Sequence, residues 1–214
     1  MSNSFLDIAT TPSVLAAQAE NGSAGLYDRA TKGRPRVRLG SAEAEFIATR
    51  DSFYMASVSE TGWPYVQHRG GPAGFLRMLD DRTLAFPDFR GNRQYISLGN
   101  VTAHDRVALI LMDYSRRRRL KLYARIEARP VDDEELRSRL TGPLAAGAER
   151  MFLLHIEAFD WNCPQHITPR FTAAEIAAAS AHLTARLMAL EAETAALRAE
   201  LAERGGAPAG PPLP

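Results

Sequence analysis

The chain has 214 residues, of which 45% are hydrophobic and 24% are charged, so it is large enough for one hydrophobic core or for one core with an appendage. Lysine and arginine total 26 against 25 aspartates and glutamates, and the net charge of +1 argues against a protein that coats nucleic acid. The single cysteine, Cys163, excludes an intramolecular disulfide framework. With no basic and apolar leader and no apolar stretch of roughly 20 residues, we expect a cytoplasmic protein that has no membrane span.

The first segments of the chain predict an arm and a helix. Residues 1–40 combine a short helical pattern at 12–20 with a glycine- and arginine-rich segment at 32–40, and we expect them to form an N-terminal arm. A helix is expected at 42–50, with Ser41 as its N-cap, because acidic residues fall in its first turns and apolar residues follow.

Two consecutive hairpins are predicted next. The first joins the β-rich residues 53–59 to the extended residues 63–68, through a turn that contains glycine. The second joins residues 74–79 to residues 83–86. Hairpins that follow one another directly are typical of an antiparallel sheet.

Two long strands follow a short helix near residues 94–98. Residues 106–114 form a continuous apolar run, which is typical of a buried strand, whereas residues 117–129 alternate between apolar and polar. The apolar face of the alternating strand consists of Leu120, Leu122, Ala124 and Ile126. With a helix at 132–140 and a strand at 151–159, the pattern predicts a mainly β fold: an antiparallel barrel with flanking helices.

The C-terminal part changes character. Residues 172–204 are rich in alanine, leucine and glutamate and contain no glycine or proline, so a long helix is predicted, and residues 205–214 are predicted to be disordered. A coiled-coil pattern of four heptads places Ile176, Leu183, Leu190 and Leu197 on one seam and Ser180, Leu187, Thr194 and Leu201 on its companion. The two polar seam residues weaken such a zipper, so a partner helix and packing against the chain's own domain both stay open.

The segment Arg90-Gly91-Asn92-Arg93-Gln94 joins a predicted strand to a predicted helix. Asn92 suits an N-cap, Gly91 permits backbone geometry closed to other residues, and the free N–H groups of a helix start favour an anion. Arg90 and Arg93 can each donate paired hydrogen bonds to phosphate oxygens. Taken alone, the segment also suits a capped helix with solvated arginines, since surface arginines are common.

A second polar segment ends a strand, at Gln67-His68-Arg69, and is followed by two glycines. Its side chains offer donors to the edge of a ring, and the glycines let a flat ring approach the backbone. His68 could act as a general base, but no partner acid is near it in the sequence, so a satisfied polar residue is the simpler interpretation.

Two further segments contain side chains that could bind a ligand. The four arginines at 116–119 open an amphipathic strand, so alternation divides them between two faces, with Arg117 and Arg119 on the polar one. Cys163 and His166 could form part of a metal site, but such a site needs more ligands, and the chain has no second cysteine. A proline-fixed loop that presents Gln165 and Arg170 over a ring is the preferred interpretation of that region.

Together these segments resemble the FMN-binding split barrels of the pyridoxamine 5'-phosphate oxidase-like family. The resemblance covers residues 42–170 and rests on ASVSETGWPYVQHRGGP, TLAFPDFRGNRQYISLGN, RVALILMDY and RRLKLYARIEAR, in that order. It implies an antiparallel split β-barrel at residues 41–171, followed by the long helix. It also implies a homodimer with two FMN sites at the subunit interface.

The resemblance further implies which residues contact FMN. The strand that lines the isoalloxazine ring and the ribityl chain corresponds to Gln67, His68, Arg69 and Gly70, and the neighbouring strand end to Phe86 and Pro87. The pair that binds the phosphate corresponds to Asn92 and Arg93, with Arg90 and Gln94 as helpers. Arg119 falls where the other subunit contacts the flavin, and Gln165 and Arg170 lie near the ring by analogy.

The chain departs from the true oxidases at its C-terminal end. It has WNCPQHITPRF and a long helix where those enzymes hold pyridoxal phosphate, which argues against pyridoxamine phosphate oxidation. The leading hypothesis is an FMN-dependent oxidoreductase that acts on an unidentified small molecule, without metal or nucleic acid. Two alternatives stay open: a non-enzymatic flavin-binding or sensing protein whose helix engages a partner, and a reductase that uses the deazaflavin F420 on the same fold.

Overall fold

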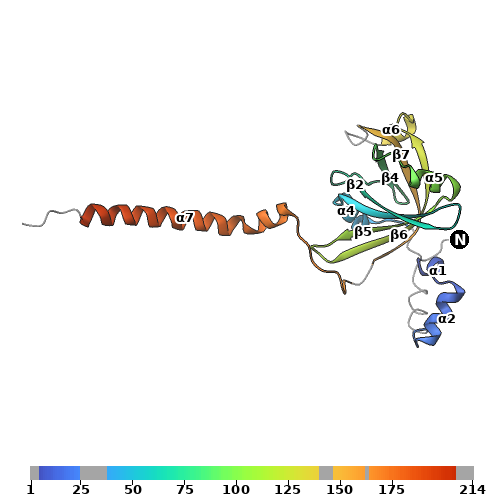
Figure 1. The fold of residues 1–214 in the computed structure, drawn as a ribbon, viewed down its shortest axis with the longest axis horizontal. Helices are drawn as coiled ribbons and strands as arrows, with labels where there is room; N and C mark the ends of the chain where they lie inside the picture. The colour runs from blue at the N-terminus through green and yellow to red at the C-terminus, as the bar shows by residue number, and fades with distance from the viewer. Residues whose placement is uncertain (1–4, 25–37, 140–146, 162–163, 206–214) are drawn as a thin grey trace, which may run out of the picture. The chain divides into compact units, whose positions relative to one another are not determined.

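The structure is a computed structural model that describes residues 5–24, 38–139, 147–161 and 164–205 (Figure 1). The chain divides into two compact units, residues 1–169 and residues 170–214. The predictions for residues 32–37, for Cys163 and for residues 206–214 lie outside the described part of the chain.

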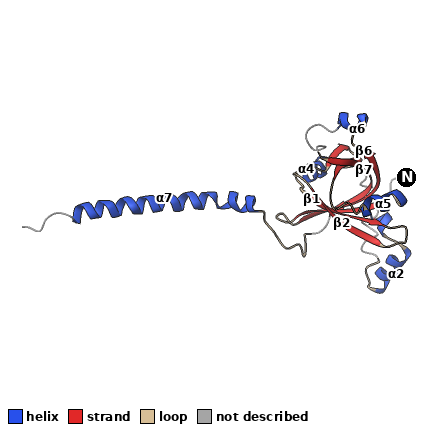
Figure 2. Cartoon of the chain, turned by 45° about the horizontal axis from the view of Figure 1, so that its top comes forward, coloured by secondary structure: helices blue, strands red, loops and turns tan. Residues whose placement is uncertain are grey.

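Seven strands of the first unit form one antiparallel sheet in the order β2-β1-β5-β6-β7-β4-β3 (Figure 2). The strands are β1 (Ser52–Val58), β2 (Pro64–Gly70), β3 (Arg77–Asp80), β4 (Thr83–Phe89), β5 (Arg106–Asp113), β6 (Arg118–Pro130) and β7 (Ala148–Trp161). The edge strands β2 and β3 make no ladder with each other among the described residues, so the barrel is split and not closed. The predicted antiparallel split barrel with flanking helices is confirmed.

Short helices flank this sheet. They are α1 (Phe5–Ala9), α2 (Pro12–Glu20), α4 (Ser41–Ala48), α5 (Ile96–Ala103) and α6 (Glu134–Arg139). The predicted N-cap of α4 is wrong by one residue: Gly40 is the cap, and its N–H donates to the Glu43 carboxylate at 2.8 Å. Within the arm, α1 contacts the barrel through Phe5, whose ring stacks on Tyr123 of β6 with centroids 4.5 Å apart.

Both predicted hairpins are present, but β4 continues past its predicted end at Phe86. Residues Phe86 to Phe89 pair with β7 alone, because the first residue of β3, Arg77, lies opposite Ala85. Proline lacks the N–H that an inner strand uses, and it is tolerated where a strand has a free edge. The end of β4 is therefore an open edge that carries Asp88.

The core lies between the inner faces of the curved sheet. The four predicted apolar residues of β6 are each at most 3% exposed, which confirms the predicted alternation. An aromatic cluster fills the space beneath β4, where Phe86 contacts the rings of Phe53 and Phe152 at centroid distances of 5.1 and 5.3 Å. Each buried phenylalanine contributes roughly 1.5–3 kcal/mol to folding.

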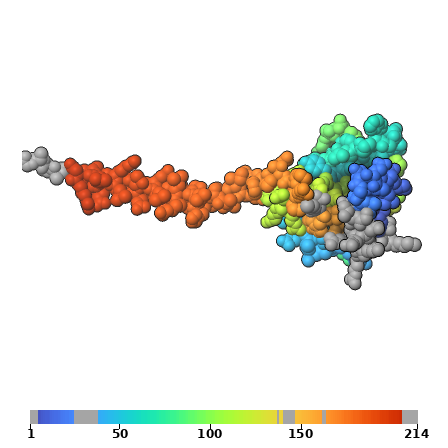
Figure 3. Space-filling model, turned by 90° about the horizontal axis from the view of Figure 1, so that it is seen from below, coloured from blue at the N-terminus to red at the C-terminus, as the bar shows by residue number. Residues whose placement is uncertain are grey.

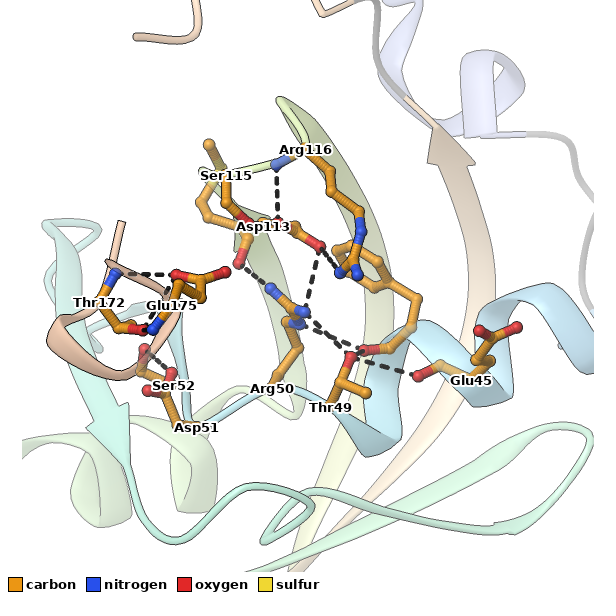
Figure 4. A network of polar contacts seen from close by, with 12 residues as sticks. Glu45, Thr49, Arg50, Asp51, Ser52, Asp113, Ser115, Arg116, Thr172 and Glu175 are labelled. Atoms are coloured by element: carbon orange, nitrogen blue, oxygen red, sulfur yellow. Dashed lines mark hydrogen bonds and ion pairs between the residues drawn. The ribbon is translucent and has the colours of Figure 1, made fainter. Parts of the chain in front are cut away.

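A buried ion pair joins the end of α4 to the turn between β5 and β6 (Figure 4). Arg50 donates to the Met112 carbonyl oxygen at 2.8 Å, and a second guanidinium nitrogen lies 3.2 Å from the Asp113 carboxylate. Burial raises the pKa of Asp113, but the hydrogen bond from the Arg116 backbone N–H and the charge of Arg50 outweigh it, so the net pKa is lowered from 3.8.

The same turn corrects the prediction for the arginine run. The strand begins at Arg118, and Arg117 lies in the turn with a φ of 56°, so Arg117 and Arg119 do not share a strand face. Arg117 donates to the Pro164 carbonyl oxygen at 3.1 Å, and Arg116 lies 3.3 Å from the Asp113 carboxylate. The first two arginines of the run lie in the turn before β6, so the alternation of strand residues does not predict where their side chains point.

The second unit contains α7 (Ala173–Gly205). A reciprocal capping box begins it: Thr172 N–H donates to the Glu175 carboxylate at 2.8 Å, and Glu175 N–H donates to the Thr172 hydroxyl at 3.1 Å. None of the described helices is long and apolar enough to cross a membrane.

The Asp113 ion pair predicts a pH-dependent loss of stability. We expect Asp113→Asn to lower the free energy of unfolding at pH 7 by about 3 kcal/mol, because Arg50 loses its buried counter-charge. Since the folded-state pKa of Asp113 is depressed, its contribution is present above its unfolded pKa of about 3.9 and is lost as the pH falls through the folded value. The wild type and the variant should therefore begin to converge in urea unfolding as the pH falls below about 4, and the convergence should be complete only below the folded pKa.

Asp105→Asn is the matched control for this measurement, because Asp105 pairs with Arg125 at the surface. An exposed pair contributes about 0–1 kcal/mol, so this variant should unfold almost as the wild type does. Equal losses in the two variants at pH 7 would contradict the structural role of Asp113.

Candidate anion-binding site

A hollow opens where β2, the end of β4 and the start of α5 meet, at the split of the barrel. The space between its walls, part of which is open to solvent, measures about 410 Å³. Its walls are three alternate residues of β2 (Tyr65, Gln67 and Arg69), the end of β4, the loop 91–95 and the first turn of α5. The hollow thus combines segments that are distant in the sequence.

Five predicted site residues line this hollow: Gln67, Arg69, Asn92, Arg93 and Gln94. They come from two segments, and the fold brings these segments together because α5 packs against β1, the strand paired with β2. The Ser97 hydroxyl donates to the Gln67 side-chain oxygen at 2.6 Å. Behind it, the buried Asn100 amide donates to the Ser57 hydroxyl at 3.0 Å, which ties α5 to β1.

The other predicted residues of β2 and β4 do not line the hollow. His68 and Gly70 alternate with Gln67 and Arg69, so they lie on the opposite face of β2, where the His68 ring contacts Tyr54 at a centroid distance of 5.5 Å. Phe86 is 0% exposed and belongs to the core, and Pro87 is also buried.

The remaining predicted residues lie elsewhere. Arg90 is exposed, with its Nε 3.9 Å from the Glu149 carboxylate. Arg119 is on β6, opposite Met112 of β5, and Gln165 lies in an exposed turn. Arg170 belongs to the second unit. None of these four residues lines the hollow.

The loop before α5 differs from its prediction. The helix begins at Ile96 and Tyr95 occupies the N-cap position, so Asn92 is not the cap. The Asn92 side-chain oxygen instead accepts from the Gln94 backbone N–H at 3.1 Å, in a local turn. Gly91 has no left-handed backbone, whereas Arg93 and Tyr95 do, with φ of 62° and 51°.

A left-handed backbone raises the conformational energy of any residue other than glycine, as it does for Arg93 and Tyr95. Such strained conformations concentrate at functional sites. They turn the chain sharply before α5, and the first turn of the helix contributes Ile96, Ser97 and Leu98 to the wall. The N–H groups of a first helical turn have no partner within the helix. The hollow therefore has backbone donors at one end.

Asp88 lies between two guanidinium groups at the edge of the hollow. It is 7% exposed and accepts from Arg69 at 2.6 Å and from Arg150 of β7 at 2.5 Å. The Arg69 guanidinium also lies 5.8 and 5.6 Å from the rings of Phe86 and Phe152, and its buried Nε has no hydrogen-bond partner among the described residues. This ion pair connects β2 to β4 across the split, where no backbone ladder does.

Asp88 and Arg150 are not among the predicted site residues. The sequence shows an aspartate beside a proline at the end of an apolar strand. Its partners, however, depend on two features of the tertiary structure. Asp88 pairs with Arg150 only through the register of β4 on β7, and with Arg69 only through the curvature of the sheet. Neither fact is visible in a local pattern.

At the rim of the hollow, some of the described arginines pair with an acidic side chain and one does not. Tyr95 donates its hydroxyl hydrogen to Glu149 at 3.1 Å, and Arg150 donates to the same carboxylate at 3.3 Å. Arg90 is nearest to Glu149 as well. Arg93 makes no hydrogen bond or ion pair with any other described residue, so it is the unpaired cation of the hollow.

The chemistry of the lining favours an anion. Gln67 uses its side-chain oxygen to accept from Ser97, so it has N–H donors to offer. Among the described residues that line the hollow, Asp88 is the only acidic one, and it is already paired with two arginines. Phosphate groups are recognised by this combination of guanidinium, amide and helix-start donors. Among the described residues, no group of three or more His, Cys, Asp or Glu side chains could hold a metal ion.

The Asp88 triad predicts a specific response to phosphate. Asp88→Asn removes the counter-charge of Arg69 and Arg150, and we expect the free energy of unfolding to fall by about 3 kcal/mol. Because the released Arg69 faces the hollow, inorganic phosphate should raise the melting temperature of this variant more than that of the wild type. Thermal unfolding over a phosphate series measures this difference.

Asp113→Asn is the matched control, since Asp113 is also a buried carboxylate beside two arginines but lies outside the hollow. Its melting temperature should respond to phosphate as the wild type does. A phosphate response of equal size in the two variants would show that the hollow has no special affinity for the anion.

The comparisons with known proteins agree with this fold. The sequence profile of the pyridoxamine 5'-phosphate oxidase family matches residues 39–166, which is more than half of the chain. The chain belongs to this family. No curated protein sequence matches it.

Several solved structures are similar at low identity. HupZ from group A Streptococcus is 12% identical, with a TM-score of 0.47 over 62% of this chain and 100% of that one. An FMN-binding protein from Syntrophomonas wolfei is 14% identical, with a TM-score of 0.41 over 71% of this chain and 95% of that one. An F420 reductase is 23% identical, with a TM-score of 0.38 over 54% of this chain and 94% of that one.

Proposed function

We propose that the hollow binds the phosphate of FMN and that the chain is an FMN-dependent oxidoreductase acting on a small molecule. The observation that carries this proposal is the donor set at the split of the barrel: an unpaired Arg93, an Arg69 held in place by Asp88, and the N–H groups of the first turn of α5. Family membership supports this proposal. The resemblance implies FMN contacts at Gln67, Arg69, Asn92, Arg93 and Gln94, and all five line the hollow.

Different residues of the hollow would contact different parts of the ligand. Arg93 and the helix-start amides neutralise and orient the phosphate, while Asn92 and Gln94 hold the loop in the turn that presents them. Gln67 and Arg69 follow one another along the inner face of β2 and offer N–H donors to the rest of the ligand. Phe86 and Pro87 act from beneath, by supporting Arg69 and the open edge of β4.

Bound flavin supplies the hydride or electron transfer itself. The chain's own residues then bind, orient and desolvate it, and no acid, base or nucleophile of the protein is required. A general base at His68 is not part of this proposal, because His68 lies on the face of β2 that points away from the hollow.

We also propose that a second copy completes the site. The outer face of β2 and β1 exposes apolar side chains, among them Tyr54, Val58 and Val66, the last of which is 62% exposed. Further along the same face, Arg119 has a buried Nε without a hydrogen-bond partner among the described residues. A homodimer through this face would cover the apolar side chains, and the family resemblance assigns Arg119 to the flavin of the other subunit.

The phosphate assignment predicts a large effect of one arginine. Arg93→Ala should weaken FMN binding tenfold or more, because a charged hydrogen bond contributes about 1.5–3 kcal/mol. Fluorescence titration of FMN measures this affinity, and Arg106→Ala, which removes an exposed arginine outside the hollow, is the control that should bind as the wild type does. If FMN neither binds nor raises the melting temperature of the wild type, the proposed function fails.

The dimer proposal predicts that one charge on the outer face separates the copies. A chain that ends at residue 171 should remain a dimer in light scattering, and Val66→Glu in that shortened chain should make it a monomer, because a carboxylate would be buried in the interface. Val14→Glu, at an exposed valine of α2, should leave the dimer intact. A shortened chain that is monomeric without any substitution would contradict this interface.

A further inference from the structure

The helix α7 presents an apolar seam that nothing in its own unit covers. It has 33 residues, none of them buried, and at a rise of about 1.5 Å per residue it is roughly 50 Å long. Figure 3 shows its residues in orange to red. Its large apolar side chains are between 41% and 70% exposed. Those on the seam are Ile176, Leu183, Leu187, Leu190, Leu197 and Leu201.

The seam follows a heptad repeat with positions a and d. Position d is held by Ile176, Leu183, Leu190 and Leu197, and position a by Ser180, Leu187, Thr194 and Leu201. Leucine at d is typical of two-stranded coiled coils.

The two polar residues of the seam are satisfied within the helix. The Ser180 hydroxyl donates to the Ile176 carbonyl oxygen at 2.9 Å, and the Thr194 hydroxyl donates to the Leu190 carbonyl oxygen at 2.7 Å. Burial between two helices would therefore leave neither hydroxyl donor without a partner. The polar positions do not prevent the seam from being buried.

The charges beside the seam are unpaired within their own helix. Arg186 and Glu193 occupy g positions, Glu191 and Arg198 occupy e positions, and none of the four makes an ion pair among the described residues. Each also lacks an opposite charge three or four residues away, where a helical partner would lie. By contrast, Arg204, further along, pairs with Glu200 at 2.6 Å.

We propose that α7 pairs with α7 of a second copy of this chain in a parallel, in-register, two-stranded coiled coil. In that arrangement a g residue faces the e residue five positions further along the other helix. Arg186 then meets Glu191 of the partner subunit, and Glu193 meets Arg198 of the partner subunit. Two-fold symmetry doubles both contacts, so all four unpaired charges of each helix find an opposite charge.

Charge complementarity also selects the direction of the pair. An antiparallel pair places e positions opposite e positions, and at full overlap Glu191 would face Thr184 and Arg198 would face Ala177. Half of the flanking charges would then remain unpaired. The parallel register is the arrangement that uses them all.

Disulfide trapping in the full-length chain tests this pairing. In a Cys163→Ser background, Leu197→Cys places one thiol per copy at a d position, and Ala199→Cys places it on the outer side of the same turn. We expect the disulfide-linked dimer to form about tenfold faster for Leu197→Cys than for Ala199→Cys. An antiparallel coil would instead link Leu197→Cys to Ser180→Cys in a mixture of the two variants.

A charge swap in the Leu197→Cys background tests the register. The substitutions Arg186→Glu and Arg198→Glu make all four flanking residues acidic, and Glu191→Arg and Glu193→Arg make them all basic. Each variant alone should lose most of its cross-linking at low salt, and an equimolar mixture of the two should recover it as a heterodimer.

Three results would overturn the proposal. They are equal rates at positions 197 and 199, cross-linking that does not respond to the charge swap, and a Leu197→Cys variant that forms no cross-linked dimer. The last result would mean that the seam is covered by another partner or by the chain's own first unit. Because the substituted side chains of α7 are exposed or, at Ser180, partly exposed, circular dichroism should show an unchanged helix content in all variants.

Discussion

The ion pair between Arg69 and Asp88 is the contact on which the candidate site depends. The sheet is split, and its edge strand β2 makes no backbone ladder with β4, so side chains must hold the two together at this place. Asp88 does so because it is buried between Arg69 and Arg150, and a buried carboxylate needs counter-charges of this kind. This ion pair holds β2 and the end of β4 at a fixed distance, and the hollow lies open to solvent beside it.

The other features of the hollow follow from that arrangement. Asp88 and Glu149 pair with the nearby guanidinium groups of Arg69, Arg90 and Arg150. Arg93 is then the cation of the hollow that has no partner among the described residues. The left-handed backbone at Arg93 and Tyr95 aims the loop, and the contacts of Ser97 and Asn100 anchor the helix that follows it. A site that is rich in donors and has one unpaired cation is suited to a bound phosphate.

Much of the fold was predictable from local patterns, and the failures have identifiable physical causes. Alternation located the strands and their buried faces, as in β6, because the period of a strand depends only on its backbone. The same alternation could have shown that His68 lies opposite Gln67 and Arg69, but the resemblance to the family grouped all three. The helix start was misplaced at Asn92 because a local side-chain turn imitates a cap. Asp88 escaped notice because its two partners come from other strands.

The most direct test of the account is the identity of the small molecule that copurifies with the chain. The protein should be purified without added cofactor, its absorption spectrum recorded, and the ligand released by denaturation and identified by mass. We predict a flavin spectrum and the mass of FMN, at close to one molecule per chain. A purified chain with no flavin absorption that takes up no FMN when it is offered, or one that releases F420, would contradict the assignment of this site to FMN.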